Sequence, residues 1–505
     1  STDSGSAVTV VDTTALDLLA LTAASLSVTA GGAVTDSGTL AITGATTISA
    51  SGQDITLDEA ASTFGTLALT GANVAVTENA ATDLGASTVS GTFGITSGGA
   101  ITDSGTQAIT GAATFTNTAG TNDAITLDDA SNAFSGTVTL STDSGSAVTV
   151  VDTTALDLLA LSAASLSVTA GGAVTDSGTL AITGATTISA SGQDITLDEA
   201  ASTFGTLALT GANVAVTENA ATDLAASTVS GTLGVTSTGA VTDSGTLAIT
   251  GATTISASGQ DITLDEAAST FGTLALTGAN VAVTENAATD LGASTVSGTF
   301  GITSGGAITD SGTQTITGAA TFTNTAGTND AITLDDASNA FSGTVTFSTD
   351  SGSAVTVVDT TALDLLALSA ASLSVTSGGA VTDSGTLAIT GATTISASGQ
   401  DITLDEAAST FGTLALTGAN VAVTENAAMD LGASTIGGTA NFNSTSNVIT
   451  DSGTLAITGA TTINAGTADI TLDQAASTFG ALALTGANVA VTENAATDLA
   501  ASTVS

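Results

Sequence analysis

The chain is built from near-identical internal repeats. The segment STDSGSAVTVVDTTALDLLAL begins at residue 1 and returns almost unchanged at residues 141 and 348, and DITLDEAASTFGTLALTGANVAVTENAA begins at residues 54, 194, 261 and 401. The sequence therefore divides into super-repeats 1–140, 141–347 and 348–505, within one continuous segment 1–505. Repetition of this kind restricts the fold to architectures in which a small unit stacks on copies of itself.

A shorter period lies inside the super-repeats. Short runs of apolar residues and Thr, such as AVTD, ITLD and AVTE, each end in an acid, and 22 such acids follow one another at intervals of 20–26 residues. If each acid marks one turn of the chain, the mean turn has about 23 residues, which is typical of a solenoid.

The runs themselves have the alternation of β-strands. In ITL (55–57), LAL (67–69), VAV (74–76) and LAI (40–42), large apolar residues flank a Thr or Ala, and Gly, Asn, Asp and Ser lie between the runs as turn formers. The sequence predicts an all-β, right-handed parallel β-helix of about 22 coils of 20–26 residues, with a length of roughly 105 Å. Neither end departs from the repeat pattern to form a cap, so we expect the segment to be an excerpt of a longer chain.

The composition excludes most chemistry. The 505 residues include no Lys, Arg, His or Cys, and 46 acids give a net charge of −46. No general base is available for a Ser or Thr nucleophile, and no side-chain cation can hold a phosphate. No stretch is apolar enough to cross a membrane. We therefore expect a chain that is not an enzyme, does not bind nucleic acid and does not insert into membranes.

The acids are the one chemical feature that recurs. On a parallel β-helix we expect them to stack into a surface ladder with neighbours about 5 Å apart. Under one interpretation they bond the backbone of turns and keep the surface soluble; under the other they bind Ca²⁺, although no known calcium-loop consensus occurs. No cofactor is required under the first interpretation. The candidate metal ligands are Asp36, Asp58, Glu78, Asp103, Asp128, Asp152, Asp176, Asp198, Glu218 and Asp243.

Two further patterns have structural interpretations. The adjacent acids Asp58/Glu59 and Asp128/Asp129 recur in later copies, and we interpret them as solvated turn residues, because strand neighbours point to opposite faces and no aromatic platform for a sugar is present. A Phe follows each ITLD segment at constant offset, and we expect these side chains to fill the core. They are Phe64, Phe134, Phe204, Phe271, Phe341, Phe411 and Phe479.

Degenerate repeats such as AVTDSGTLAITGATTISASGQDITL resemble the repeat regions of large bacterial surface exoproteins of the filamentous-haemagglutinin-like and autotransporter-adhesin families. This resemblance implies a parallel β-helical shaft, an extracellular or cell-surface location, and an adhesive or filament-forming role.

The expected function is that of a non-enzymatic structural shaft or an extracellular filament subunit. Its expected partners are copies of itself, joined end to end or laterally, or other surface components. The alternative is a Ca²⁺-dependent surface or matrix protein that binds divalent cations along a carboxylate ladder. A carbohydrate-active enzyme would require a groove with two carboxylates about 5–10 Å apart.

Overall fold

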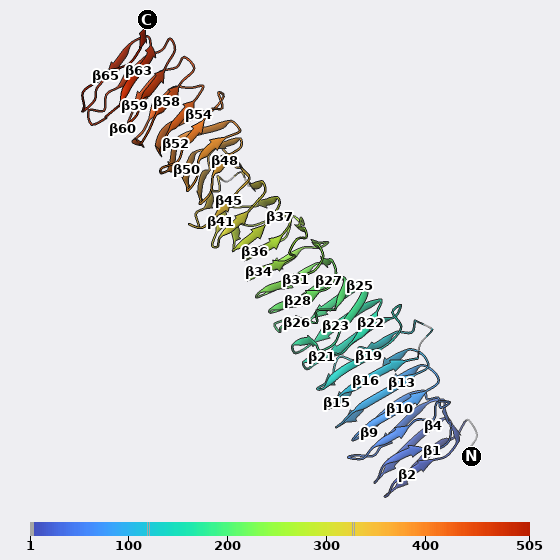
Figure 1. Ribbon diagram of the computed structural model, residues 1–505. Coiled ribbons are helices and arrows are strands. Elements are labelled where there is room, and N and C mark those ends of the chain that lie inside the picture. The colour runs from blue at the N-terminus through green and yellow to red at the C-terminus, as the bar shows by residue number, and fades with distance from the viewer. Residues whose placement is uncertain (1–4, 119, 121, 326, 328) are drawn as a thin grey trace. The chain divides into compact units, whose positions relative to one another are not determined.

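The computed structural model describes residues 5–118, 120, 122–325, 327 and 329–505. These residues fall into two compact units, Ser1–Gly251 and Ala252–Ser505. Each unit is a stack of coils made of short strands (Figure 1). That one solenoid runs unbroken from residue 1 to residue 505 stays a prediction.

In the first unit, twelve strands stack in parallel, one per coil, through eleven consecutive pairings. They are β2 (Leu16–Leu18), β5 (Val34–Asp36), β8 (Ile55–Leu57), β10 (Val74–Glu78), β13 (Phe93–Ser97), β16 (Ala113–Asn117), β19 (Thr137–Ser141), β21 (Leu156–Leu158), β24 (Val174–Asp176), β26 (Ile195–Leu197), β28 (Val214–Glu218) and β31 (Leu233–Ser237).

The other strands of the same coils are β1 (Ala7–Asp12), β3 (Leu21–Ala23), β4 (Ser25–Ala30), β6 (Leu40–Ile42), β7 (Ala45–Ser49), β9 (Thr66–Gly71), β11 (Thr82–Leu84), β12 (Ser87–Val89), β14 (Ile101–Asp103), β15 (Gln107–Ile109), β17 (Ile125–Leu127), β18 (Ala133–Phe134), β20 (Ala147–Asp152), β22 (Leu161–Ala163), β23 (Ser165–Ala170), β25 (Leu180–Ser189), β27 (Thr203–Gly211), β29 (Thr222–Leu224), β30 (Ser227–Val229), β32 (Val241–Asp243) and β33 (Leu247–Ile249).

The second unit repeats this arrangement over thirteen levels, the last of which holds two short strands. The levels are β35 (Ile262–Leu264), β37 (Val281–Glu285), β40 (Phe300–Ser304), β43 (Ala320–Asn324), β46 (Thr344–Ser348), β48 (Leu363–Leu365), β51 (Val381–Asp383), β53 (Ile402–Leu404), β55 (Val421–Thr424), β58 (Ala440–Asn443), β61 (Thr461–Asn464), β63 (Ala481–Gly486), and β65 (Asp498–Leu499) with β66 (Thr503–Val504).

Its remaining strands are β34 (Ala252–Ser256), β36 (Thr273–Gly278), β38 (Thr289–Leu291), β39 (Ser294–Val296), β41 (Ile308–Asp310), β42 (Gln314–Ile316), β44 (Ile332–Leu334), β45 (Ala340–Phe341), β47 (Ala354–Asp359), β49 (Leu368–Ala370), β50 (Ser372–Ser377), β52 (Leu387–Ala397), β54 (Thr410–Gly418), β56 (Met429–Leu431), β57 (Ser434–Ile436), β59 (Ile449–Asp451), β60 (Leu455–Ile457), β62 (Ile470–Leu472) and β64 (Val489–Val491).

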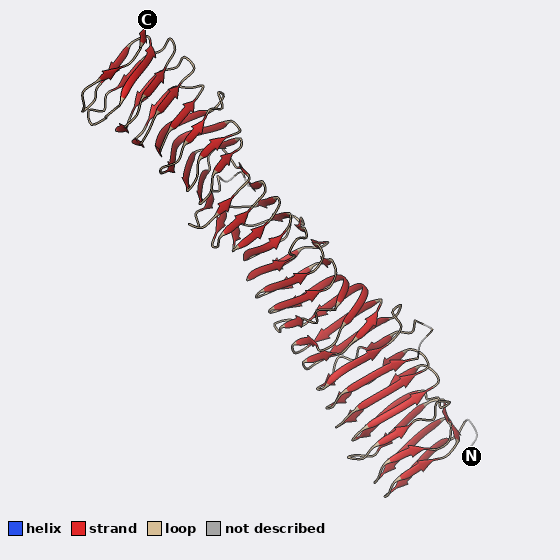
Figure 2. Cartoon of the chain, viewed as in Figure 1, coloured by secondary structure: helices blue, strands red, loops and turns tan. Residues whose placement is uncertain are grey.

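The fold is an all-β parallel β-solenoid of about 25 turns. Figure 2 shows strands and loops only, and no helix occurs among the described residues. Consequently none of the described segments is a helix long and apolar enough to cross a membrane. The predicted fold class is confirmed, and the right-handed winding stays a prediction.

The coils are shorter and more variable than the spacing of the acids indicates. From one coil to the next, paired residues lie as few as 17 positions apart, as for Thr66 and Asp83, and as many as 25 apart, as for Ala113 and Val138. The predicted 22 coils are therefore close to the observed number but too few. The reason is that several coils contain no acid of the series, so counting acids undercounts turns.

Side chains alternate between the core and the surface along each strand. In β8, Ile55 and Leu57 are fully buried while Thr56 lies between them, partly exposed. All seven Phe residues that follow the ITLD segments are buried, which confirms the predicted core role. Phe115 packs edge to face against Phe93 and Phe134, with ring centroids 5.8 and 5.9 Å away, so aromatic contacts join two neighbouring coils.

Replacing Phe115 by Ala should destabilise these two coils by about 3–5 kcal/mol, because it removes a fully buried ring and leaves a cavity. Hydrogen exchange of the amides of β13 and β16 measures this loss. Thr114→Ala, on the outward side of the same strand, is the matched control and should change exchange little. Equal effects of the two substitutions would contradict the packing described here.

Candidate functional site: the buried carboxylates

Most of the predicted site acids lie inside the solenoid. Of the ten candidates, only Asp58, Asp128 and Asp198 are exposed. The other seven are buried, together with equivalent acids of the second unit. This set, here called the buried carboxylates, comprises Asp36, Glu78, Asp103, Asp152, Asp176, Glu218, Asp243, Glu285, Asp359, Asp383, Glu425 and Asp451.

Strand alternation places Asp36 in the interior. Val34 and Asp36 are the first and third residues of β5 and share its buried side, while Thr35 faces outward. In the register of the sheet, Asp36 pairs with Leu18 of the preceding coil. Asp36 therefore occupies a core position at the end of its strand.

The carboxylate of Asp36 binds the backbone of the next coil. Strand β8 ends at Leu57, and the N–H of the following residue, Asp58, donates to Oδ1 of Asp36 over 2.8 Å. A buried backbone N–H requires an acceptor, and here a side chain supplies it. The same bond joins Asp103 to Asp128, Asp176 to Asp198, Asp310 to Asp335, Asp383 to Asp405, and Asp451 to Asp473, at 2.7–2.8 Å.

Glu78 makes the corresponding connection to the preceding coil. It is the last residue of β10, and its Oε1 accepts a hydrogen bond of 2.6 Å from the N–H of Phe64. Its Oε2 accepts a second bond, of 2.9 Å, from the hydroxyl of Thr82. Glu285 repeats both bonds with Phe271 and Thr289.

Asp152 closes a third kind of turn. Its Oδ1 accepts bonds from the N–H of Phe134, in the preceding coil, and from the N–H of Thr154, at 3.1 and 3.0 Å. Asp359 does the same with Phe341 and Thr361. In all three kinds of site, an acid without any basic partner is held by backbone N–H groups.

The predicted surface ladder of acids is wrong. Asp12 pairs in register with Ala30, Asp36 with Leu18, and Glu78 with Ser97, so these acids of the series do not pair with one another in the sheet register. The acids recur every 20–26 residues, whereas the coils are 17–25 residues long. Successive acids therefore occupy different positions along their coils.

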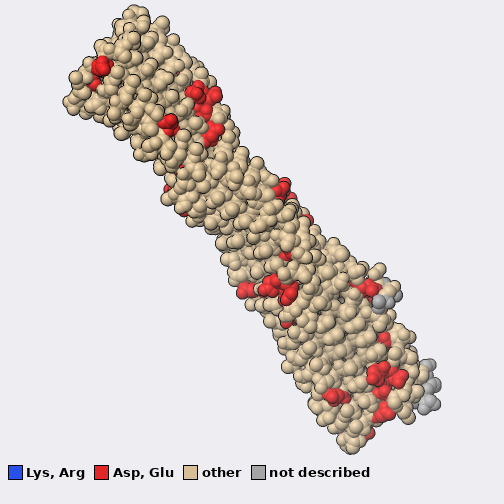
Figure 3. Space-filling view, in the orientation of Figure 1, with Lys and Arg blue, Asp and Glu red and all other residues tan. Residues whose placement is uncertain are grey.

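The metal interpretation has no cluster to support it. Across the part of the chain that the structure describes, no group of three acids lies close enough together to hold a metal ion. Figure 3 shows exposed acids in small groups separated by uncharged surface. Some of them bind hydroxyls of the next coil: Asp17 accepts a bond of 2.7 Å from Ser37, and Asp83 accepts one of 2.9 Å from Ser104.

A neutral partner for some buried carboxylates was not recognised from the sequence. The amide Nδ2 of Asn132 donates to Oδ2 of Asp103 over 2.6 Å, and its Oδ1 accepts a bond from the N–H of Gln107. Where the repeat has Ser62 in place of Asn132, Oδ2 of Asp36 has no partner. The internal copies show this difference between Asn and Ser: one class reads DDASNAF and the other reads DEAASTF.

Burial raises the pKa of these carboxyl groups. Loss of hydration is the largest cause, and the backbone N–H bonds oppose it. Burial raises the pKa of Glu78 to about 7 and that of Asp383 to about 6. For Glu78 the difference from the ordinary value of 4.5 is worth about 3 kcal/mol.

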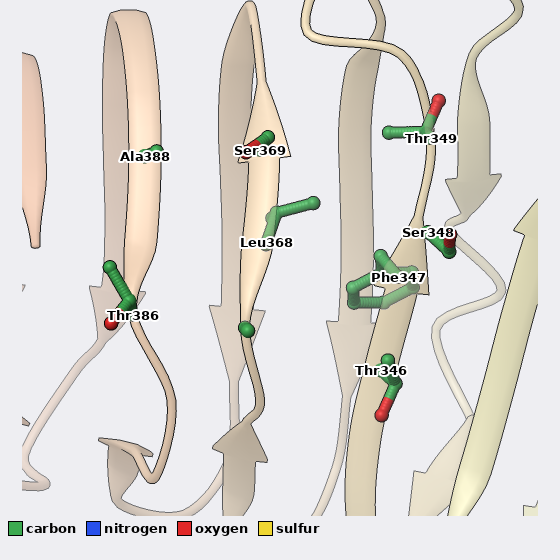
Figure 4. Close-up of a pocket in the computed structure, with 9 residues that line it drawn as sticks. Thr346, Phe347, Ser348, Thr349, Leu368, Ser369, Thr386 and Ala388 are labelled. Atoms are coloured by element: carbon green, nitrogen blue, oxygen red, sulfur yellow. The ribbon is translucent and has the colours of Figure 1, made fainter.

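The surface also carries a shallow groove that recurs in each unit. In the second unit it has a volume of about 470 Å³, with Phe347 and Leu368 at its base and Ser and Thr around them (Figure 4). Its counterpart in the first unit is lined by Leu140 and Leu161. Neither groove contains an acid, so neither offers the carboxylate pair of a glycosidase.

Stacked parallel coils with repeating internal contacts define the class of β-solenoid repeat proteins. The chain belongs to the family described as repeats of unknown function (DUF5649), whose model matches residues 5–70, 71–141, 145–210, 211–277, 278–348, 352–417 and 418–485. No curated protein and no solved structure matches the chain.

Replacing Asn132 by Ala should destabilise its coil by about 1–3 kcal/mol, because the N–H of Gln107 and Oδ2 of Asp103 lose their partner inside the core. Chemical denaturation, together with hydrogen exchange at Gln107, measures the effect. The control is Ser131→Ala at the exposed neighbouring position. An unchanged exchange rate at Gln107 would contradict the assigned role of Asn132.

The stability of the fold should fall as the pH rises. The pKa values of the buried carboxylates are higher in the folded chain than in the unfolded chain, so the folded state holds more protons. The resulting stabilisation is complete below the unfolded pKa of about 4 and is lost between about pH 4 and pH 8.

Thermal unfolding at constant salt should therefore give a higher Tm at pH 4.5 than at pH 8.5. Glu78→Gln should reduce this dependence, because the amide does not titrate, whereas Thr77→Ala, on the outward side of the same strand, removes no titrating group and should leave it unchanged. A Tm that rises with pH would contradict the assignment.

Proposed function

We propose that this chain is a non-enzymatic structural segment, the shaft or filament part of a protein on the outside of a bacterial cell. The observation that carries the proposal is the unbroken stacking of coil on coil within each unit, in which every strand level pairs in parallel with the next. Such a stack extends in one direction and presents the same surface many times.

The bonds of the buried carboxylates support this role. In each of the three kinds of site, the carboxylate joins its own coil to an adjacent one, through a backbone N–H such as that of Asp58, Phe64 or Phe134. A segment whose coils are joined at regular intervals by buried hydrogen bonds resists local opening, which is a useful property in a shaft.

The surface chemistry supports an extracellular location. A chain with no Lys or Arg offers no cleavage site to trypsin-like proteases, and a net charge of −46 disfavours binding to nucleic acid. The resemblance of the repeats to shafts of filamentous-haemagglutinin-like and autotransporter-adhesin proteins points the same way. The proposed partners are further copies of the chain or other surface components, without insertion into the membrane.

Electron microscopy and surface labelling test the proposal together. Antibodies raised against residues 1–505 should label intact cells, and the purified protein should form thin, unbranched particles in negative stain. Labelling that appears only after the cells are permeabilised would contradict the extracellular role. Compact round particles would contradict the shaft.

A chelator separates the shaft from the Ca²⁺-dependent alternative. Since the described acids form no group of three, removal of divalent cations should leave the Tm unchanged. A decrease of many degrees, restored by added Ca²⁺, would favour the alternative and oppose the proposal.

A further inference from the structure

One buried carboxylate lacks the partner that its copies have. Glu425 is fully buried in the turn after β55, and neither of its carboxylate oxygens has a hydrogen-bond partner of normal geometry. In two copies, the hydroxyls of Thr82 and Thr289 bind Glu78 and Glu285, and in a third copy Glu218 keeps its bond to the N–H of Phe204. The residue at the corresponding position here is Met429, whose thioether cannot donate a hydrogen bond.

The loop that stacks on Glu425 also differs from its copies. In an intact copy, Gly305 lies so close to the coil below that an added Cβ would be 2.4 Å from the carbonyl oxygen of Asn286. At Glu425 the corresponding residues are Thr445 and Ser446, and the loop is one residue longer. Both residues adopt positive φ, 41° and 77°, a conformation that is unfavourable for side chains of this kind.

These two features act on the same coil. The N–H of Glu425 donates to the carbonyl of Asn443, and the hydroxyl of Thr445 donates to the carbonyl of Glu425. The unfavourable loop therefore covers the turn that contains the unpartnered acid. Local opening would relieve the strain at Thr445 and Ser446, and it would let the Glu425 carboxylate reach water.

No other charge compensates Glu425. The elements around it are β53, β54, β56 and β58, and the acids at their ends are Asp405, Glu406 and Asp430, of which Asp430 binds the hydroxyl of Thr413. Burial raises the pKa of Glu425 to about 8, opposed only by the nearby N–H of Phe411. Ionisation of Glu425 therefore creates a buried charge without a partner, which is strongly unfavourable.

We propose that the coil containing Glu425 and Met429 is a built-in weak point, at which the solenoid opens locally when the pH rises above neutral, before other coils open. The change from Thr to Met at position 429 and the unfavourable loop at 445–446 together make this coil different from its copies. Met429 and the loop at 445–446 are therefore the two differences from the other copies that make this one coil sensitive to pH.

The chain carries its own reporter for this opening. Met429 is the only methionine, and it is fully buried. Hydrogen peroxide oxidises an accessible methionine to the sulfoxide, with transfer of one oxygen atom to sulfur and release of water. Mass spectrometry then measures the rate of opening at a single site.

The experiment compares Met429 with a methionine in an intact coil of the same molecule. Leu291→Met introduces that second reporter at the buried position that corresponds to Leu431, beside the Glu285–Thr289 pair, and Leu-to-Met exchange is well tolerated in cores. Between pH 6 and pH 9, oxidation at position 429 should accelerate by roughly two orders of magnitude, because the opening constant rises about tenfold per pH unit until the folded-state pKa of about 8 is reached. Oxidation at position 291 should accelerate less, because Glu285 keeps its hydrogen bonds to the N–H of Phe271 and the hydroxyl of Thr289.

Two variants test the cause. Glu425→Gln should abolish the acceleration at position 429, because the amide does not titrate. Met429→Thr combined with Leu431→Met restores the missing hydroxyl and keeps a reporter in the coil, so the acceleration of its oxidation with pH should fall to that of position 291. Circular dichroism confirms that each variant is folded at both pH values.

Equal acceleration at positions 429 and 291 would mean that the whole solenoid opens, and it would overturn the proposal. An acceleration that persists in Glu425→Gln would overturn it as well. Neither result depends on where the protein is located or on whether it forms filaments.

Discussion

Most coils of this solenoid contain a turn whose backbone N–H groups need an acceptor beyond the strand ends, and a buried carboxylate supplies it. Parallel stacking satisfies the N–H and C=O groups of the strands, but it leaves N–H groups such as those of Asp58 and Phe64 beyond the strand ends. Asp36 and Glu78 accept hydrogen bonds from these two groups. The absence of basic residues is therefore compatible with buried acids, because the backbone takes the place of a cation.

This arrangement has a cost that varies along the chain. A carboxylate in the core loses its hydration, and the loss is offset only as far as hydrogen bonds replace it. Asp103 has a backbone N–H and the amide of Asn132, and Glu78 has a backbone N–H and a hydroxyl. Glu425 has neither a hydroxyl nor a well-formed backbone bond. The copies of one repeat thus differ in local stability although their sequences are almost the same.

Much of the fold could be predicted from the sequence. The runs at 40–42, 55–57 and 74–76 lie within β6, β8 and β10, because alternation of large and small residues fixes which side of a strand is buried. The same alternation puts Asp36 on the side of Val34, so its burial was in principle visible. The surface ladder followed from placing the acids at equivalent positions of stacked coils, and it fails because the coils do not keep the period of the acids. The register could not be predicted, because coils of different length alternate without a signal in the spacing of acids.

Potentiometric titration of the native and the denatured chain tests the central claim most directly, since it counts the protons that each state holds. The account predicts that between about pH 4 and pH 8 the native solenoid holds more protons than the denatured chain, because burial raises the pKa of its buried carboxylates. Superimposable curves, or a native curve with fewer protons bound, would contradict it.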